Sequence, residues 1–315
     1  MGFLFVFCLL CSLGITSFGL TVEGAFWVSK EYRYDVLFLA LARNCAKTIP
    51  NFVSSLARMS GEGIRVHALV GENGSDDGTR YLLSAASAST GLLTVVDTAV
   101  MSNSTDRLER MALGRQLLAD RAKSLSTSAR VVCVIDVDEP FLDHVSATAL
   151  NVVLQKLSSC DSLFAVSATS KPSYYDLLAY EDEHTSFHDL EERIRRLRGN
   201  PYRYYMLFKN TIYPEQDRLT RTFDFTCTSA FNGMCFYKGE SYHFGSYRPR
   251  ADVPCVCEHV TFNRSMVAAT GGYMEVNASL VLPMPKEHGR RTLPGFLWQR
   301  LRKLPAFVSS KVRFS

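Results

Sequence analysis

The 315-residue sequence lacks internal repeats and low-complexity segments, which argues against a repeat architecture and against a disordered chain. Its composition, 47% hydrophobic and 21% charged, is instead that of an ordinary globular protein. The length is sufficient for one large domain or for two modest ones.

The sequence has no excess of basic over acidic residues outside the C-terminal end of the chain. Residues 286–315 hold eight of the 35 Lys and Arg side chains and one of the 31 acids, so the rest holds 27 basic and 30 acidic groups. A nucleic-acid-binding protein more often has a basic face on its folded domain, so we expect no nucleic-acid partner. We treat 286–315 as an appended basic tail. Its segment 293–307 could lie on an anionic membrane surface, or could be a disordered basic end.

No charged residue occurs between Gly2 and Leu20. A helix of that length, at about 1.5 Å per residue, comes close to the roughly 30 Å hydrocarbon core of a membrane. We therefore expect residues 1–24 to be a signal anchor or a cleaved signal peptide, and the protein to be associated with a Golgi or ER membrane. No Lys or Arg precedes the apolar run, whereas Lys30 and Arg33 follow it, so the orientation stays open.

The nine cysteines provide no ordinary zinc-knuckle pattern. Cys255 and Cys257 are separated by a single residue, which is too close for such a knuckle, and no second C-x-C pair occurs. Together with Cys227 and Cys235 they could form one or two disulfides in an oxidising lumen. A structural zinc site built from the same four residues is the less favoured alternative.

Apolar runs alternate with segments of helical spacing through the first half of the chain. The expected strands are 35–42, 64–70, 92–96, 130–135 and 163–168. The expected helices are 48–59, 79–88, 108–125, 150–157 and 181–198. Strands that are apolar on both faces and alternate with helices predict an α/β fold with a mostly parallel sheet covered on both sides.

Two polar motifs follow expected strands, and in open α/β sheets ligands bind beyond the carboxyl ends of the strands. The first, 71–79, reads G-E-N-G-S-D-D-G-T. Its glycines allow a tight turn, and Glu72, Asn73 and Asp76 could hydrogen-bond a base or a ribose. The alternative is a solvated turn capped by Asp77 or Thr79.

The second motif is a D-x-D sequence, Asp136 and Asp138, directly after the expected strand 130–135. Alternate residues of an extended chain point the same way, so the two carboxylates can converge on one hard divalent cation. Such a metal binds the diphosphate of a nucleotide sugar and neutralises the charge that develops on the leaving group.

The order of these features resembles a GT-A (Rossmann-like) nucleotide-sugar-binding glycosyltransferase. An apolar strand with Arg43-Asn44 is followed by E-N-G-S-x-D-G-T, an Arg-containing helix and D-x-D. The resemblance extends over 35–282, within an expected domain of 30–285. More closely, the chain resembles the fungal capsule-associated α-mannosyltransferases and related microbial proteins in three motifs: Tyr174-Tyr175-Asp176, Ser229-Ala230-Phe231-Asn232-Gly233 with Tyr237-Lys238, and Cys257-Glu258-His259-Val260.

The resemblance implies roles for individual residues. The nucleoside would contact Glu72, Asn73 and Asp76, and Arg43 and Arg115 would lie near the nucleotide. Mn²⁺ or Mg²⁺ would be held by Asp136, Asp138 and His259. Beside Asp138, the catalytic candidates are Glu258 and Asp176, which would position the acceptor hydroxyl or act as a base. An acceptor sugar would lie against Tyr174, Tyr175, Phe231, Asn232 and Gly233.

The activity so implied is the metal-dependent transfer of a hexose from a nucleotide sugar to a glycan hydroxyl. The resemblance suggests mannose from GDP-mannose and retention of configuration. One alternative is a catalytically inactive relative that serves as a binding or scaffold protein. The other is a sugar-nucleotide nucleotidyltransferase, which would carry a Gly-rich motif near the first strand, where 37–50 has no glycine.

Overall fold

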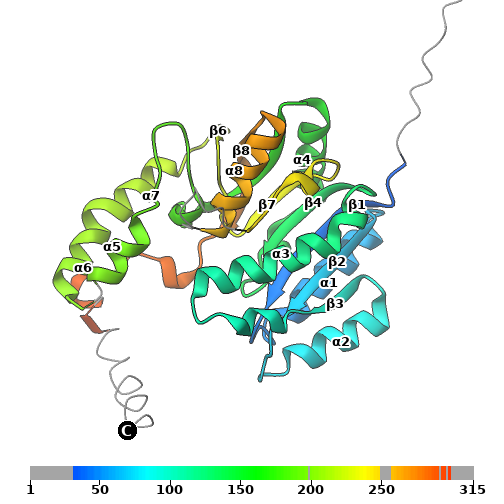
Figure 1. Ribbon diagram of the computed structural model, residues 1–315, viewed down its shortest axis with the longest axis horizontal. Coiled ribbons are helices and arrows are strands. Elements are labelled where there is room, and N and C mark those ends of the chain that lie inside the picture. The colour runs from blue at the N-terminus through cyan, green and yellow to red at the C-terminus, as the bar shows by residue number, and fades with distance from the viewer. Residues whose placement is uncertain (1–30, 198, 249–256, 291, 296, 299–315) are drawn as a thin grey trace, which may run out of the picture. The chain divides into compact units, whose positions relative to one another are not determined.

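The computed structural model describes residues 31–197, 199–248, 257–290, 292–295 and 297–298 (Figure 1). The chain divides into Met1–Glu31 and Tyr32–Ser315, and the second unit contains every element described below. The predicted anchor and most of the predicted basic tail lie outside the described residues. Within the described part, no helix is both long enough and apolar enough to cross a membrane.

A single mixed sheet of eight strands organises the described unit, in the order β3-β2-β1-β4-β7-β5-β8-β6. The strands are β1 (Tyr34–Ala42), β2 (Val66–Glu72), β3 (Leu93–Asp97), β4 (Ala129–Asp136), β5 (Leu163–Lys171), β6 (Phe225–Cys227), β7 (Met234–Lys238) and β8 (Tyr273–Pro283). Four neighbouring pairs are parallel (β1·β2, β1·β4, β2·β3 and β5·β8), and β7 runs antiparallel to both β4 and β5. The predicted α/β class with a mostly parallel sheet is confirmed.

Helices cover both faces of the sheet. They are α1 (Ile49–Gly61), α2 (Thr79–Thr90), α3 (Arg107–Ser126), α4 (Ala147–Ser159), α5 (Leu190–Leu197), α6 (Pro201–Leu207), α7 (Tyr213–Leu219) and α8 (Glu258–Thr270). A π-helical turn, η4 (Phe208–Ile212), joins α6 to α7, and a short 3₁₀ helix, η6 (Lys286–His288), follows β8.

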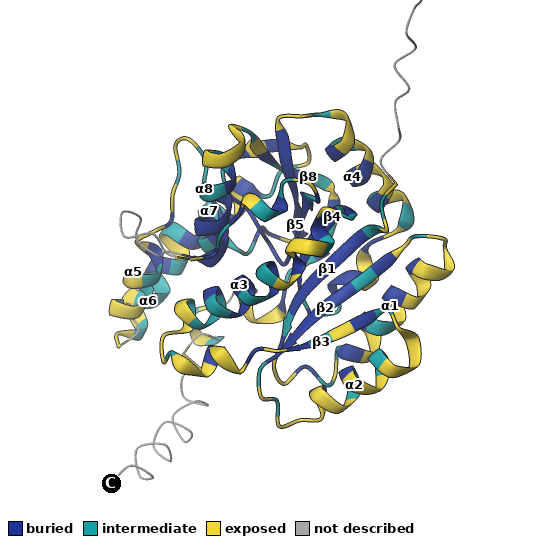
Figure 2. Cartoon of the chain, turned by 45° about the vertical axis from the view of Figure 1, so that its right-hand side comes forward, coloured by how far each residue is buried: buried dark blue, intermediate teal, exposed yellow. Residues whose placement is uncertain are grey.

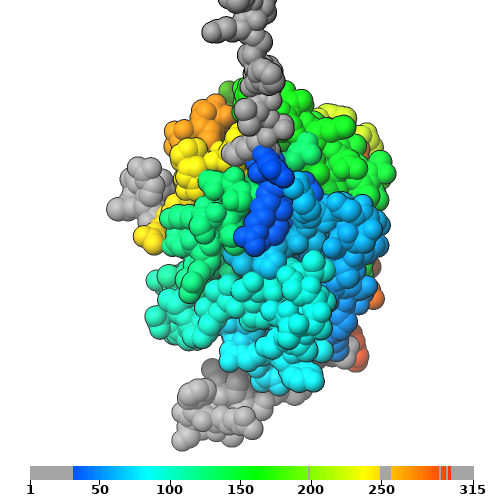
Figure 3. Space-filling model, turned by 90° about the vertical axis from the view of Figure 1, so that its right-hand side faces the viewer, coloured from blue at the N-terminus to red at the C-terminus, as the bar shows by residue number. Residues whose placement is uncertain are grey.

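Successive residues of β1 belong to two different hydrophobic layers. Leu37 and Leu39 pack in the layer that includes α3 and α8, and Phe38 packs in the layer of α1, α2 and α4. This alternation explains why β1 is apolar along most of its length, since both of its faces are covered. Figure 2 shows most of β1 and β2 in dark blue and the outer faces of α1 and α2 in yellow. In Figure 3, the first half of the chain, blue to green, forms most of the visible face.

The strand and helix predictions for residues 35–168 are confirmed to within a few residues at their ends. The predicted helix 181–198 is wrong at its beginning, because α5 starts only at Leu190. Glu181 instead forms isolated β-bridges with Ser186 and Ser229, and its carboxylate accepts a hydrogen bond from Arg264 of α8. Tertiary pairing therefore overrides the local helical preference of this acidic stretch.

The predicted disulfides are absent among the described cysteines, where Cys227, Cys235 and Cys257 are all free. Cys227 lies in β6 and Cys235 in β7, and the sheet places β5 and β8 between these strands. Three strand spacings amount to about 14 Å, whereas a disulfide needs Cα atoms within about 7 Å. Cys255 lies outside the described residues.

Candidate functional site

The strands β1, β2 and β4 run in parallel and end together at one edge of the sheet. Register pairs Ala42 with Glu72 and Leu41 with Asp136, so the segments that follow these strands emerge side by side. A pocket of about 1050 Å³ opens at this edge. Arg43 after β1, Asn73 after β2, and Asp136 and Asp138 at the end of β4 all line it. The pocket thus lies at the edge where ligands bind in open α/β sheets.

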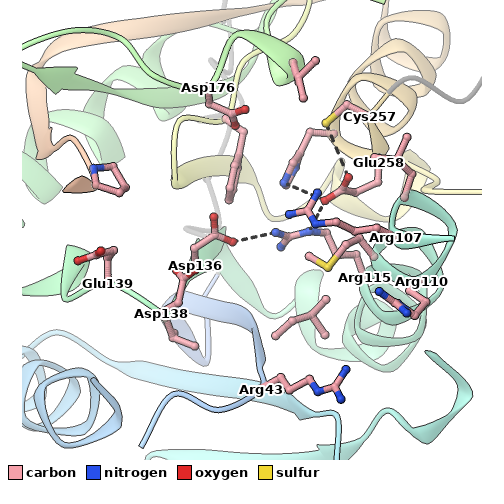
Figure 4. Close-up of a pocket in the computed structure, with 18 of the residues that line it drawn as sticks. Arg43, Arg107, Arg110, Arg115, Asp136, Asp138, Glu139, Asp176, Cys257 and Glu258 are labelled. Atoms are coloured by element: carbon pink, nitrogen blue, oxygen red, sulfur yellow. Dashed lines mark hydrogen bonds and ion pairs between the residues drawn. The ribbon is translucent and has the colours of Figure 1, made fainter. Parts of the chain in front are cut away.

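The carboxylates of the D-x-D motif are the first candidates for holding a metal ion in this pocket. Asp136, Asp138 and the adjacent Glu139 line the pocket together, and Figure 4 shows Glu139 on the side away from the arginines. Burial raises the pKa of Asp136 to about 6, because the rise caused by burial, Asp138 and Glu258 exceeds the opposing effect of Arg115. Carboxylate oxygens in such a setting suit a hard divalent cation.

Arg115 of α3 joins two parts of the site. Its Nη2 donates a hydrogen bond to Asp136 Oδ1 at 2.9 Å and its Nε donates one to Glu258 Oε1 at 3.1 Å (Figure 4). Its guanidinium carbon lies 5.1 Å from the centroid of the Phe231 ring, and only 3% of the residue is exposed. Burial alone would lower the pKa of Arg115, but Asp136 and Glu258 raise it, so the group is permanently charged. Arg115 therefore braces two carboxylates and has little surface left for a nucleotide.

The lining of the pocket contains other arginines besides Arg115. Arg43, Arg107 and Arg110 line the pocket, and no ion pair of theirs occurs among the described residues. Arg107 lies two helical turns before Arg115 on α3, and Arg110 follows it by three residues on the neighbouring stripe. Neither Arg107 nor Arg110 was predicted from the sequence, and Arg110, five residues before Arg115, is about 140° away from it around the helix, so no shared helical face indicated it. In Figure 4 these guanidiniums lie on the opposite side of Asp136 from Glu139.

His259 stacks on Phe231, with ring centroids 3.6 Å apart and an interplanar angle of 14°. The residue is buried, and neither ring nitrogen has a hydrogen-bond partner within the described part. Burial, together with the charge of Arg115, holds its pKa well below the usual value, so the ring is neutral and able to ligate. His259 lines the same pocket as the D-x-D pair, yet no three His, Cys, Asp or Glu side chains of the described residues are grouped to hold an ion.

The turn 71–79 is organised by its own acids. Glu72 is 1% exposed and does not line the pocket. It accepts hydrogen bonds from the Ser75 backbone N–H at 2.6 Å and from Arg80 Nε at 2.6 Å. These hydrogen bonds lower the pKa of Glu72, although burial acts in the opposite direction. The carboxylate is therefore already engaged in shaping the turn.

The remaining polar residues of the turn have different positions. Asn73 lines the pocket. Asp76 is exposed and does not, and its backbone N–H donates to Asn44 Oδ1 at 3.0 Å. Asp77 accepts from the backbone N–H of Ala46 at 3.0 Å and from that of Thr79 at 3.1 Å. The turn thereby fastens the loop after β1, which carries Arg43.

Of the predicted acceptor residues, Tyr175 and Phe231 line the pocket, as does the catalytic candidate Asp176. Burial raises the pKa of Asp176 to about 7, with further rises from Asp136 and Glu258. A carboxyl group with this pKa exchanges its proton near neutral pH. Tyr174 points elsewhere: it is fully buried in the hydrophobic core and does not line the pocket.

Asn232 and Gly233 contact residues that line the pocket, although they do not line it themselves. Asn232 is fully buried with a positive φ of 51°, and its side-chain oxygen accepts from the backbone N–H groups of Tyr175 at 3.2 Å and Asp176 at 3.3 Å. Gly233 has a φ of 85°, and a Cβ there would lie 2.5 Å from the Tyr175 hydroxyl and 2.6 Å from the Phe141 ring. Neither residue lines the pocket, and both hold residues that do.

One wall of the pocket was not anticipated from the sequence. It comprises residues of α5 and of the segment around η6: Glu191, Ile194, Arg195, Pro285, Glu287 and His288. The His288 ring packs on Tyr175 with a centroid separation of 5.0 Å. The expected boundary at residue 285 therefore cuts through this wall, because the first residues assigned to the tail line the pocket. No sequence pattern linked α5 to the D-x-D motif.

The sequence matches no protein-family model and no curated protein. Solved structures with a similar fold include the glucosyl-3-phosphoglycerate synthase of Mycobacterium tuberculosis in complex with Mn²⁺, UDP and glucosyl-3-phosphoglycerate. It is 15% identical, the match covers 83% of this chain and 74% of that one, and the TM-score is 0.40. The mannosyl-3-phosphoglycerate synthase of Rubrobacter xylanophilus is 17% identical, with 79% and 65% covered and a TM-score of 0.40. A mannosyltransferase of Pyrobaculum calidifontis in complex with GDP-Man and Mn²⁺ is 17% identical, with 81% and 58% covered and a TM-score of 0.42.

Proposed function

We propose that the chain is a metal-dependent glycosyltransferase of the GT-A type, which transfers a hexose from a nucleotide sugar to a glycan hydroxyl. The observation that carries this proposal is the composition of one pocket at the carboxyl ends of β1, β2 and β4. Clustered carboxylates, Asp136 and Asp138 among them, occur there with three arginines that have no ion pair in the described part. A nucleoside diphosphate with a divalent cation needs both kinds of group.

Asp136 and Asp138 would hold a resident Mn²⁺ or Mg²⁺, with the remaining ligands coming from outside any preformed group of three such side chains, since the described part contains no such group. Asp138 and Glu139 form no ion pair with another described residue, and Asp136 uses Oδ1 for Arg115, which leaves its second oxygen for a cation. His259 remains the candidate third ligand, since it is neutral and neither buried nitrogen has a hydrogen-bond partner in the described part, although Nε2 lies 3.6 Å from Glu258 Oε1. When bound, the metal would neutralise negative charge on the diphosphate leaving group.

The guanidiniums would bind the diphosphate itself. Arg43 approaches from the end of β1, and Arg107 and Arg110 approach from the first turn of α3. The planar fork of Arg binds two oxygens of a phosphate at once, and such charge-assisted bonds are the stronger ones. We assign the nucleoside to the neighbourhood of Asn73. Glu72 would act by holding the turn, and Asp76 would reach a nucleotide only from the rim.

At the other end of the pocket, we assign the acceptor to Tyr175, Asp176 and Phe231. Aromatic faces pack well against sugar rings, and Asp176 can exchange a proton with an acceptor hydroxyl near neutral pH. Glu258 is tied to Arg115, which makes it a weaker candidate for a base. Retention of configuration, and mannose as the transferred hexose, are suggested by the sequence motifs alone.

A thermal-shift panel of GDP- and UDP-sugars, each with and without Mn²⁺, tests the proposal. We expect a nucleotide sugar to raise the unfolding midpoint only when the metal is present. Release of free nucleotide in the presence of glycan acceptors would then measure turnover. The Asp138→Asn variant should lose the metal-dependent shift and the turnover while its own unfolding midpoint stays close to that of the parent.

The outcomes separate the alternatives. Full turnover by Asp138→Asn, or by the parent in excess chelator, would contradict the metal role. Metal-dependent binding with no turnover on any acceptor would favour an inactive binding protein. Pyrophosphate-dependent formation of a nucleoside triphosphate from the sugar nucleotide would indicate a nucleotidyltransferase instead.

A further inference from the structure

Two segments of the chain contain several basic residues and no acid. Residues 193–214 hold six Lys and Arg residues, and residues 288–315 hold seven. These 13 residues exceed the formal net charge of +4, so the rest of the chain carries a formal charge of −9. Two basic segments on a chain whose remainder is acidic favour an anionic partner for these segments, since the remainder would repel it.

The described start of the second segment contacts the end of the first, although about 75 residues separate them in sequence. Arg290 donates a hydrogen bond to the Tyr213 carbonyl at 3.3 Å and forms an ion pair with Asp217 of α7. Its guanidinium carbon also lies 5.5 Å from the centroid of the Tyr213 ring. These contacts fasten the start of the second segment beside the end of the first. In Figure 1 the chain after β8 returns to the vicinity of α5 and α6.

Exposed cations and exposed aromatic rings occur in α5, α6, η4 and the described residues after η6. Arg196 of α5, Arg203 of α6 and Lys209 of η4 are exposed and make no ion pair with another described residue. Tyr202 is 61% exposed and Trp298 is 62% exposed. We call these five side chains the basic-aromatic surface.

We propose that the basic-aromatic surface docks on an anionic lipid membrane. Arginines and lysines gain from the negative potential of anionic headgroups, and Tyr and Trp favour the boundary between headgroups and acyl chains. An acidic protein partner or a nucleic acid would also attract the cations. The exposed rings of Tyr202 and Trp298 are both apolar and polar, and the rest of the chain is acidic. Together with the exposed cations, these features favour a lipid interface as the partner.

Docking would place the pocket close to the membrane. The helix α5 carries Arg196 on its exposed side, and the same helix contributes Ile194 and Arg195 to the lining of the pocket. A glycan acceptor presented at a membrane could then enter directly. The docking proposal does not depend on the transferase proposal, because none of the five residues of the basic-aromatic surface lines the pocket.

Co-sedimentation of the full chain with vesicles tests the proposal. Neutral phosphatidylcholine vesicles are compared with vesicles that also contain phosphatidylserine, and the difference between them is the measured quantity, since an apolar leader would contribute to both. The variant Arg196→Gln/Arg203→Gln removes two charges, and Tyr202→Ala removes one ring. The matched control, Lys47→Gln/Arg121→Gln, removes two exposed charges from elsewhere on the described unit.

We expect phosphatidylserine to increase binding, and added salt to weaken that increase. At about 1 kcal/mol per basic residue, Arg196→Gln/Arg203→Gln should weaken it about thirtyfold, whereas the control should stay near the parent. Unchanged melting curves would show that the variants fold. No gain from phosphatidylserine, or equal losses in the two double variants, would overturn the proposal. Binding of heparin or DNA with the same variant dependence, without binding of vesicles, would replace the membrane with a soluble polyanion.

Discussion

Replacing Arg115 by Met should destabilise the protein more than any other single arginine substitution in the pocket. The change removes both charge-assisted hydrogen bonds and leaves Asp136 and Glu258 without their cation. Breaking a buried pair by removing one partner costs about 3–5 kcal/mol. For a domain of this size each kcal/mol shifts the unfolding midpoint by roughly 2–4 °C, so we expect a fall of roughly 10 °C.

The control is Arg107→Met, on the same helix and lining the same pocket but exposed. Surface substitutions usually change stability by less than about 0.5 kcal/mol, so its midpoint should move by only about 1–2 °C. Its affinity for a nucleotide sugar should fall instead. Differential scanning calorimetry without metal measures the first effect, and titration of the donor measures the second.

Arg115→Lys and the pH dependence sharpen the test. Lysine keeps the charge but cannot bridge two carboxylates with a planar fork, so it should recover only part of the loss. Arg115 restrains the rise in the pKa of Asp136, so this pKa should rise further in the Met variant, and protonation would remove the unpaired charge. The destabilisation should be largest above about pH 7 and shrink toward pH 5. A midpoint for Arg115→Met within about 2 °C of that of Arg107→Met at neutral pH would refute the reasoning.

Three further predictions concern the supports of the pocket. Asp176 has its pKa raised to about 7 by burial, so the folded protein holds this proton more tightly than the unfolded chain does, and metal-free stability should fall as pH rises from about 4 to 7. Asp176→Asn should flatten that dependence in calorimetric scans, and an unchanged slope would contradict the assignment. Gly233→Ala should lower the midpoint and the turnover together, because its positive φ and the close approach of Tyr175 leave no room for a Cβ. Glu72→Gln should weaken the ion pair with Arg80 and lower donor affinity through the turn; unaltered affinity would show that the carboxylate has no part in the site.

Much of the first half of the fold could be predicted because parallel strands covered on both faces give apolar runs. The pairing of Asp136 with Asp138 in one pocket also followed from local geometry, since alternate residues of an extended segment point the same way. The failure at 181–198 has the opposite origin. Glu181 takes its partners from Ser229 and Arg264, and contacts so distant in sequence leave no periodic signal.

In the candidate site, too, features set by local geometry could be predicted and features set by contacts distant in sequence could not. Arg115 was expected beside the nucleotide, but its second partner, Glu258, lies 143 residues away, and nothing local reveals that both of its sides are occupied. Tyr174 and Tyr175 are adjacent in sequence, but Tyr174 is buried in the hydrophobic core and Tyr175 lines the pocket. Sequence identifies residue types and their spacing, whereas long-range packing decides which of two adjacent side chains is free to bind.

The antiparallel strand β7 has a consequence for the order in which the protein is made. It pairs with β4 from Val131 to Ile135, and the Gly233 carbonyl accepts from the Asp136 backbone N–H at 3.0 Å. The ribosome supplies β7 about a hundred residues after β4. Until then the edge of the nascent β4 that later pairs with β7 is unpaired. The D-x-D motif also lacks the Gly233 carbonyl and the Phe231 side chain, which lines the pocket. The pocket end of β4 therefore cannot be completed during synthesis before β7, which ends at residue 238 of the 315, has been translated, and an unpaired strand edge is prone to aggregation in the interval.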